Sequence, residues 1–119
     1  MLSHPGERQA MASALWLGLR NYREELQRVA DAYDPEACRA LTERFDDLRL
    51  YAACLPELSV PWVSVVISRA EMTIALFKGH RDAGEREKGL ALIEVHRGHV
   101  DKLGGACIRL LEAAAVRAH

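Results

Sequence analysis

The chain has 119 residues, of which half are hydrophobic and 28% are charged, and its formal net charge is −1. This length and balance are typical of one globular domain with its own core, and they exclude a disordered chain. The near-neutral charge gives the whole molecule no electrostatic attraction to nucleic acid or to anionic lipid.

The segment 7–33 shows the hydrophobic periodicity of a helix. Its apolar residues recur in alternating steps of four and three, the pattern of a helix that packs lengthwise on its neighbours. These residues are Leu15, Leu19, Tyr22, Leu26, Val29 and Tyr33. Asp34 and Pro35 then predict the end of this helix and the start of the next, with Asp34 as the N-cap and Pro35 in the first position.

The segment 35–55 repeats the pattern of the first helix. Its apolar positions are Cys38, Leu41, Phe45, Leu48 and Leu55. Charged residues fall on its other faces, where they predict a solvated surface. The run 55–61 contains two prolines and predicts a connector, in which Ser59 is the expected cap of the following helix.

The segment 61–78 is apolar around nearly its whole circumference. Its beginning is rich in β-branched residues, so a strand over 63–67 is the competing prediction. We favour a helix because a single strand would find no partner strand elsewhere in this chain. A helix that is apolar all round has to be central in the fold or covered by another molecule.

The segment 83–117 predicts a last, long helix, which follows a turn over 79–82 and has Asp82 as its cap. Its apolar stripe consists of Gly89, Ile93, His96, Val100, Leu103, Cys107, Leu110 and Ala114. At 1.5 Å per residue this helix is roughly 50 Å long, against roughly 30 Å for the two before it. It should therefore overhang the bundle or bend, and Gly104-Gly105 is the expected bend.

Together the four segments predict an all-α fold. Short connections between consecutive helices favour an antiparallel four-helix bundle with a long, bent or overhanging C-terminal helix. At 119 residues the chain has the length of one domain, so we expect a single domain over 1–119.

His96 and His99 are the most suggestive pair for chemistry. Three residues apart on a helix, they share a face and could hold a transition metal. A zinc ion needs at least three protein ligands, and Cys107 lies roughly 16 Å from His96 by helix rise, too far for one ion. We therefore expect His96 to be a core-edge histidine bonded to a neighbour and His99 to be partly exposed. A metal site would need ligands from other helices or another subunit.

The run 99–106, His-Val-Asp-Lys-Leu-Gly-Gly-Ala, resembles the motif of histidine phosphotransfer domains. In that family an exposed histidine of a helical bundle is followed by a lysine and a small residue. Lys102 stands at the matching spacing, whereas the glycine comes one residue late and Asp101 replaces an apolar residue. The resemblance covers eight residues and implies His99 as a phosphoryl acceptor. A small metal-binding or phosphotransfer-like bundle centred on His96 and His99 is the alternative function.

The sequence gives little support for other kinds of chemistry. The three cysteines are odd in number and widely spaced, which is typical of a reducing compartment, so we expect a cytoplasmic protein. Basic residues between Lys78 and Lys88 alternate with acids, as on a solvated surface, and predict no nucleic-acid site. The most apolar stretch, Val60–Ile67, is short for a membrane span. Motifs for nucleophilic catalysis and phosphate binding are absent, so we expect neither an enzyme nor a cofactor.

The apolar segment 61–78 and the two tryptophans, Trp16 and Trp62, are the best indications of function. Broad apolar faces with aromatic residues are enriched where proteins meet, and an internal role in the core is the equal alternative. We expect a non-enzymatic interaction or regulatory protein that self-associates as a homodimer, or binds another protein, through apolar helix faces. The expected contact residues are Trp62, Ile67, Met72 and Phe77.

Overall fold

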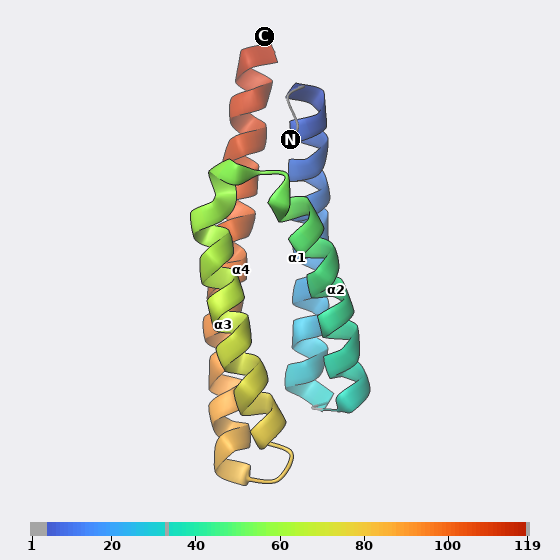
Figure 1. The fold of residues 1–119 in the computed structure, drawn as a ribbon, viewed down its shortest axis with the longest axis vertical. Helices are drawn as coiled ribbons and strands as arrows, with labels where there is room; N and C mark the ends of the chain where they lie inside the picture. Colours follow the sequence, from blue (N-terminus) through green and yellow to red (C-terminus); the bar gives the residue numbers. More distant parts are fainter. Residues whose placement is uncertain (1–4, 33, 119) are drawn as a thin grey trace.

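The structure is a computed structural model that describes residues 5–32 and 34–118. Its elements in chain order are α1 (Pro5–Ala32), α2 (Pro35–Ala53), a short 3-10 turn η1 (Pro56–Leu58), α3 (Ser59–Lys78) and α4 (Ala83–Ala118). The described residues contain no strand, so the all-α prediction is confirmed and residues 63–67 belong to a helix. In Figure 1 the chain runs down along α1, returns along α2, descends again along α3 and rises along α4.

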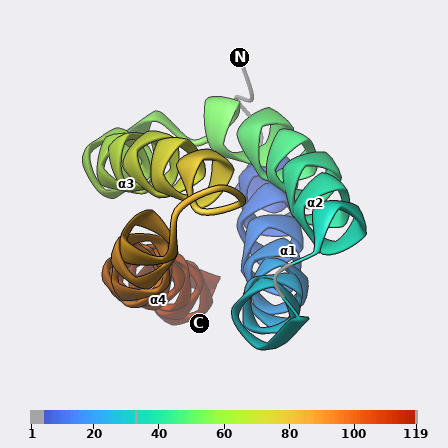
Figure 2. The ribbon, with the colours of Figure 1, turned by 90° about the horizontal axis from the view of Figure 1, so that it is seen from below.

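The helices form an elongated bundle of 55 × 22 × 21 Å. α2 packs mainly on α1, and α3 packs mainly on α4, while α1 and α4 join these two pairs (Figure 2). α2 and α3 make few backbone contacts with each other. The N-terminal part of α1 and the C-terminal part of α4 extend past the connection between α2 and α3 (Figure 1). The last helix therefore overhangs, as its length predicts.

The junction between α1 and α2 follows the sequence signal. The Asp34 carboxylate accepts a hydrogen bond from the backbone N–H of Ala37 at 2.7 Å, which confirms Asp34 as the N-cap, and Pro35 opens the helix. The expected end of α2 at Leu55 is wrong by two residues. Leu55 leaves helical geometry, with φ −128° and ψ 74°, because the following Pro56 disfavours the α conformation in the residue before it.

The start of α3 also differs from expectation. Ser59 is the first residue of the helix, and its cap position is occupied by Leu58, which makes no side-chain capping bond. Pro61 consequently lies in the first turn, where its missing N–H has no helical partner to lose. Ser59 as the cap is therefore a wrong prediction, whereas the helix itself is confirmed.

α4 begins where the sequence indicates and continues without a break. Asp82 accepts hydrogen bonds from the backbone N–H groups of Gly84 and Glu85, at 2.8 and 3.3 Å. The helix passes through Gly104 and Gly105 without interruption. The hydrogen-bonded helical ladder on either side outweighs the low helix propensity of two glycines, so no break occurs at this pair.

The core lies on the predicted helical stripes. On α1, four leucine and valine positions of the stripe and Tyr22 are buried, and Tyr33 lies outside the described residues. On α2 and the residue that precedes η1, Leu41, Phe45, Leu48 and Leu55 are buried. On α4 the stripe is buried from Gly89 to Cys107 and half-buried at Leu110 and Ala114. The 3.6-residue periodicity therefore identified the inward faces of these three helices.

An aromatic cluster at the centre takes one ring from each helix. Trp62 of α3 stacks on Phe45 of α2, with ring centroids 5.3 Å apart. Phe45 lies 5.7 Å from Tyr22 of α1, which in turn meets the edge of His96 of α4 at 5.5 Å. The Arg69 guanidinium lies over the Phe45 ring at 4.3 Å. These rings fill the space between α2 and α3, where the backbones stand apart.

Candidate functional site: the outer face of α3 and the buried histidine

α3 carries two apolar rows on opposite sides. The inner row packs against the other helices and consists of Val65, Ser68, Met72, Ala75 and Leu76. The first four are spaced by three or four residues and Leu76 follows Met72 by four, as expected for one face of a helix. Ser68 is the polar member of this row, and its hydroxyl is hydrogen-bonded to His96 of α4.

The second row, which we call the outer row, faces away from the bundle. It consists of Val60, Val63, Ile67, Ala70, Ile74 and Phe77. The five large members are between 51% and 78% exposed. Their steps of three, four, three, four and three residues repeat the spacing of a coiled-coil seam. This face of α3 therefore has the pattern of a helix that packs on another helix, and none of the described helices covers it.

The outer row is large for an exposed apolar surface. From their exposed fractions, its five large side chains present roughly 600 Å² to solvent, the upper end of what a monomeric protein shows in one patch. On the other helices the exposed large hydrophobic residues are spread singly: Leu17, Leu50, Leu90, Val95, Ile108 and Val116. Scattered residues of this kind are ordinary, so α3 carries the unusual surface.

The structure separates the four expected contact residues. Ile67 and Phe77 lie in the outer row and are exposed. Met72 is a wrong choice for a contact residue, because it is 1% exposed in the inner row. Trp62 stacks on Phe45 within the bundle and is half-buried, so it acts first as a core residue. Trp16 likewise packs on the core, with the Arg20 guanidinium 5.1 Å from its ring.

Sequence reasoning missed Val60, Val63, Ala70 and Ile74 as members of one face. Two interleaved rows, both with steps of three and four, make α3 apolar all round, so its overall hydrophobicity does not reveal which row faces inward. The signal that separates them is Ser68. A serine in one row needs a polar partner when buried, and a histidine on another predicted stripe, His96, supplies it.

His96 is fully buried at the middle of the bundle, and both of its ring nitrogens are hydrogen-bonded. Its Nε2 lies 2.7 Å from the Tyr22 hydroxyl of α1, and its Nδ1 lies 2.7 Å from the Ser68 hydroxyl of α3. Ser68 also donates to the backbone carbonyl of Val65 at 3.1 Å. Because the serine proton is used there, the arrangement that satisfies every group has Nδ1–H donating to Ser68 and Nε2 accepting from Tyr22.

This network holds the imidazole uncharged. The pKa of His96 is lowered to about 4, mainly by burial and in smaller part by the electrostatic effects of Arg69 and His99. Burial raises the pKa of Tyr22 above its ordinary value, against the opposing effect of the Arg69 guanidinium. The expectation of a satisfied histidine is confirmed, although His96 lies in the core rather than at its edge.

The geometry leaves no ring nitrogen of His96 for a metal ion or a phosphoryl group. Its two hydroxyl partners would have to be displaced first, at the cost of leaving buried polar groups unpaired. Over residues 5–32 and 34–118, His, Cys, Asp and Glu side chains form no group of three that could hold a metal. His99 is half-buried one turn further along α4. The alternative function centred on these two histidines therefore gains no support from their surroundings.

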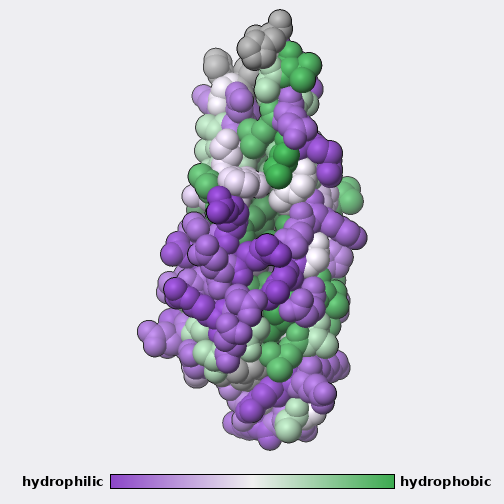
Figure 3. Space-filling view, turned by 180° about the vertical axis from the view of Figure 1, so that it is seen from behind, coloured by the Kyte–Doolittle hydropathy of each residue, from purple (hydrophilic) through white to green (hydrophobic). Residues whose placement is uncertain are grey.

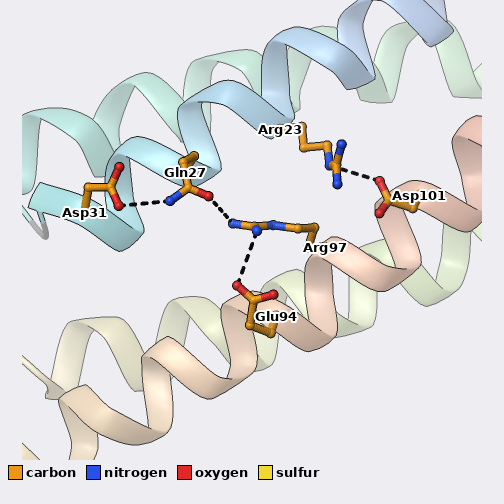
Figure 4. Close-up of polar contacts among 6 residues, drawn as sticks. All are labelled: Arg23, Gln27, Asp31, Glu94, Arg97 and Asp101. Atoms are coloured by element: carbon orange, nitrogen blue, oxygen red, sulfur yellow. Dashed lines mark hydrogen bonds and ion pairs between the residues drawn. The ribbon is translucent and has the colours of Figure 1, made fainter.

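The opposite face of the bundle, formed by α1 and α4, is crossed by polar contacts. Arg23 meets Asp101 at 3.1 Å, and Arg97 donates to Gln27 at 2.7 Å (Figure 4). Glu94 also pairs with Arg97, at 3.4 Å. Hydrophilic residues accordingly cover the middle of this face, and hydrophobic ones appear both above and below them (Figure 3).

A hollow of about 420 Å³ lies on the same face between α1 and α4. Three arginines line it, which would suit an anion. Arg23 and Arg97 are already paired with Asp101 and Glu94, however, and Arg20 lies on the Trp16 ring. Partners within the chain take up these cations, so this hollow is a weaker candidate than the outer row.

The length of the apolar region on α3 is greater than the stretch 60–67 suggests. Among the described residues, the helical segment Pro56–Lys78 is long and apolar enough to cross a membrane by length and composition alone. Core helices of soluble proteins meet the same criterion, but they are mostly buried, whereas only 28% of the most apolar stretch of this segment is buried. This small buried share again identifies the outer side of α3 as the exposed apolar surface of the molecule.

Comparison of the chain with protein-family models, with curated proteins and with solved structures gave no significant match.

Proposed function

We propose that this chain is a non-enzymatic interaction protein that self-associates as a homodimer through the outer row of α3. The observation that carries the proposal is the exposed row of apolar side chains with the spacing of a helix-packing seam. In water such a face is costly, and covering it with a second apolar face removes both from solvent.

The composition of the row suits an interface. It contains no charged residue, and charged residues are depleted at the centres of protein interfaces. Ile67 lies near its middle and Phe77 at its end, so a partner helix can surround the first and pack along the second. Central, fully desolvated side chains contribute most to binding, which makes Ile67 the expected anchor.

The test compares two single substitutions by sedimentation velocity over a wide range of concentrations. We expect the wild-type chain to sediment as a dimer that dissociates on dilution. Ile67→Glu would place a charge at the centre of the interface, and we expect it to raise the dimer dissociation constant at least about 100-fold, which corresponds to about 2.7 kcal/mol.

Leu50→Glu is the matched control. Leu50 is 68% exposed on α2, away from the outer row, so this variant adds the same charge to an equally apolar position. We expect it to dimerise like the wild type, and both variants to keep the helical circular dichroism of the parent. A wild-type chain that stays monomeric at all concentrations, or equal weakening by both substitutions, would contradict the proposal.

A further inference from the structure

We infer that the two copies of α3 pair antiparallel, about a two-fold axis that passes between Ile67 and Ala70. This inference rests on the proposed function and adds the orientation and register of the interface. It follows from the spacing of the outer row, from the sizes of its side chains and from the charges at the two ends of α3.

The spacing of the outer row is the same in both directions. Its steps are three, four, three, four and three residues, so the row reads identically from either end. A two-fold axis at its midpoint therefore superposes row on row, as an interface between identical copies requires. Ile67 then meets the partner's Ala70, Val63 meets the partner's Ile74, and Val60 meets the partner's Phe77.

The side-chain sizes in this register complement one another. At the centre, the small side chain of Ala70 leaves room for the partner's Ile67, and this pairing occurs twice. At each end the largest residue, Phe77, is opposite a valine. A parallel pairing in register would instead place Ala70 against the partner's Ala70, which leaves a gap, and Phe77 against the partner's Phe77. Packed interfaces fill gaps and alternate large with small residues, so the antiparallel register fits better.

Charges at the ends of α3 favour the same orientation. Lys78 is the last residue of the helix. Glu57, two residues before the first residue of α3, is paired with Arg8 of its own chain and is therefore not counted as a partner for Lys78. A parallel arrangement would bring the two lysines together at one end, whereas the antiparallel arrangement places them at opposite ends. The helix dipoles also oppose one another favourably only when the helices are antiparallel.

The exposed area matches what a small specific interface needs. Complete burial of the five large residues of the row, roughly 600 Å² on each copy, would remove roughly 1,200 Å² in total from solvent, which reaches the lower limit of specific interfaces and is above most fortuitous contacts. Helices packed at a seam of this kind lie about 8–10 Å apart, close enough for the six side chains of each row to interdigitate.

Disulfide cross-linking between introduced cysteines tests the register. The background variant replaces the three native cysteines, as Cys38→Ser, Cys54→Ser and Cys107→Ala, and must keep the wild-type sedimentation profile. Into it we would introduce Ala70→Cys, Val63→Cys or Ile74→Cys singly. Position 70 lies beside the axis, so the Ala70→Cys chain should form a disulfide with position 70 of its partner in either orientation. This variant therefore tests only whether the outer row is the interface.

The other two positions distinguish the orientations. In the antiparallel register, position 63 lies 11 residues, or roughly 16 Å, along the helix from the partner's position 63, which is too far for a disulfide. It lies opposite the partner's position 74. Equal amounts of the Val63→Cys and Ile74→Cys chains, mixed and mildly oxidised, should therefore yield the mixed disulfide in roughly tenfold excess over either self-linked product, as resolved by mass spectrometry.

Three outcomes would overturn the inference, and each of them rejects a different part of it. Self-linked Val63→Cys in excess would show a parallel pair and reject the register while leaving the dimer intact. Ala70→Cys that does not cross-link, in a chain that nevertheless sediments as a dimer, would show that another face is used. A monomeric wild-type chain would reject the proposed function as well. If that monomer co-sediments with vesicles of phosphatidylcholine and phosphatidylglycerol, and Ile67→Glu abolishes this, the partner of the row is a membrane.

Discussion

The buried imidazole of His96 illustrates how a polar residue can be accommodated at the centre of a bundle. The residue has one donor and one acceptor when neutral, and Ser68 and Tyr22 match them at 2.7 Å each. A charged imidazole would carry two donors, and Nε2–H would then point at the Tyr22 hydroxyl, whose own proton would lose its acceptor. The network therefore stabilises the fold only while His96 is neutral.

The unfolding free energy should fall as the pH is lowered through the range set by His96. Its pKa is about 4 in the folded chain and 6.5 ordinarily, so the unfolded chain binds the proton first. The stabilising contribution is complete above pH 6.5 and declines as the pH falls towards 4. We expect a loss of roughly 1.4 kcal/mol at pH 5.5 and about 3 kcal/mol at pH 4, measured by urea unfolding.

The control for this pH dependence is His96→Phe, which removes the titrating group. Carboxylates also titrate near pH 4, but they contribute to both proteins, so the difference between the two pH profiles isolates His96. Parallel profiles for the two proteins between pH 7 and pH 4 would contradict the assignment of the network as neutral.

From the sequence, the burial of His96 could be predicted but its partners could not. Its place on a stripe with steps of four and three puts it on the inward face of α4. Tyr22 and Ser68 are 74 and 28 residues away, and only the relative rotation and height of three helices bring their hydroxyls to the ring. Periodicity within one helix contains no information on that register.

Among the elements, the glycines inside the helices show how space decides the effect of a substitution. A Cβ added at Gly104 would meet no atom within 4 Å. At Gly18, where α1 approaches α2, an added Cβ would lie 2.8 Å from the Leu48 side chain. Both positions are in the middle of a helix, where glycine is less favourable than alanine by about 1 kcal/mol.

Gly104→Ala should stabilise the protein by roughly 0.5–1 kcal/mol, because the helix gains propensity and nothing has to move. Gly18→Ala should fall short of this gain by about 1 kcal/mol or more, because the end of the buried Leu48 side chain must shift to make room. Thermal and urea unfolding of the two single variants measure the difference. An equal gain at both positions would show that α1 and α2 can separate freely at Gly18.

For α3 the element was predictable and its orientation was not. The choice of helix over strand followed from the lack of a partner strand, and its end at Lys78 agrees with the sequence. Which side faces inward depends on the packing of α3 against α4, and both sides offer an apolar row. That ambiguity led to Met72 as a contact residue and hid the role of Ile74.

At the scale of the whole molecule, the bundle consists of two helix pairs that are joined closely along α1 and α4 and loosely between α2 and α3. Trp62 bridges the loose side by stacking on Phe45, and Arg69 covers the same ring. Phe77, at the other end of α3, is 78% exposed and makes no comparable bridge. The two aromatic residues of α3 should therefore differ in their effects on folding.

Trp62→Ala should lower the unfolding free energy by about 2–3 kcal/mol, because it removes the aromatic stack between the two helix pairs. Phe77→Ala should change it by less than about 0.5 kcal/mol, as for an exposed position. Both are measured by urea unfolding in the Ile67→Glu background, so that self-association does not contribute. A larger effect at position 77 than at position 62 would contradict the arrangement of α3 described above.

The overhanging ends of α1 and α4 have a consequence for how the molecule opens. Beyond the connection between α2 and α3, each of these helices has one neighbour instead of two (Figure 1). From Glu112 to Arg117, all residues of α4 except Ala114 are exposed, so fraying there breaks few apolar contacts. Amide hydrogens should therefore exchange with solvent in a gradient along the long axis, fastest at this end and slowest around Ile93. The overhanging ends of α1 and α4 can therefore unfold locally while the centre of the bundle stays folded.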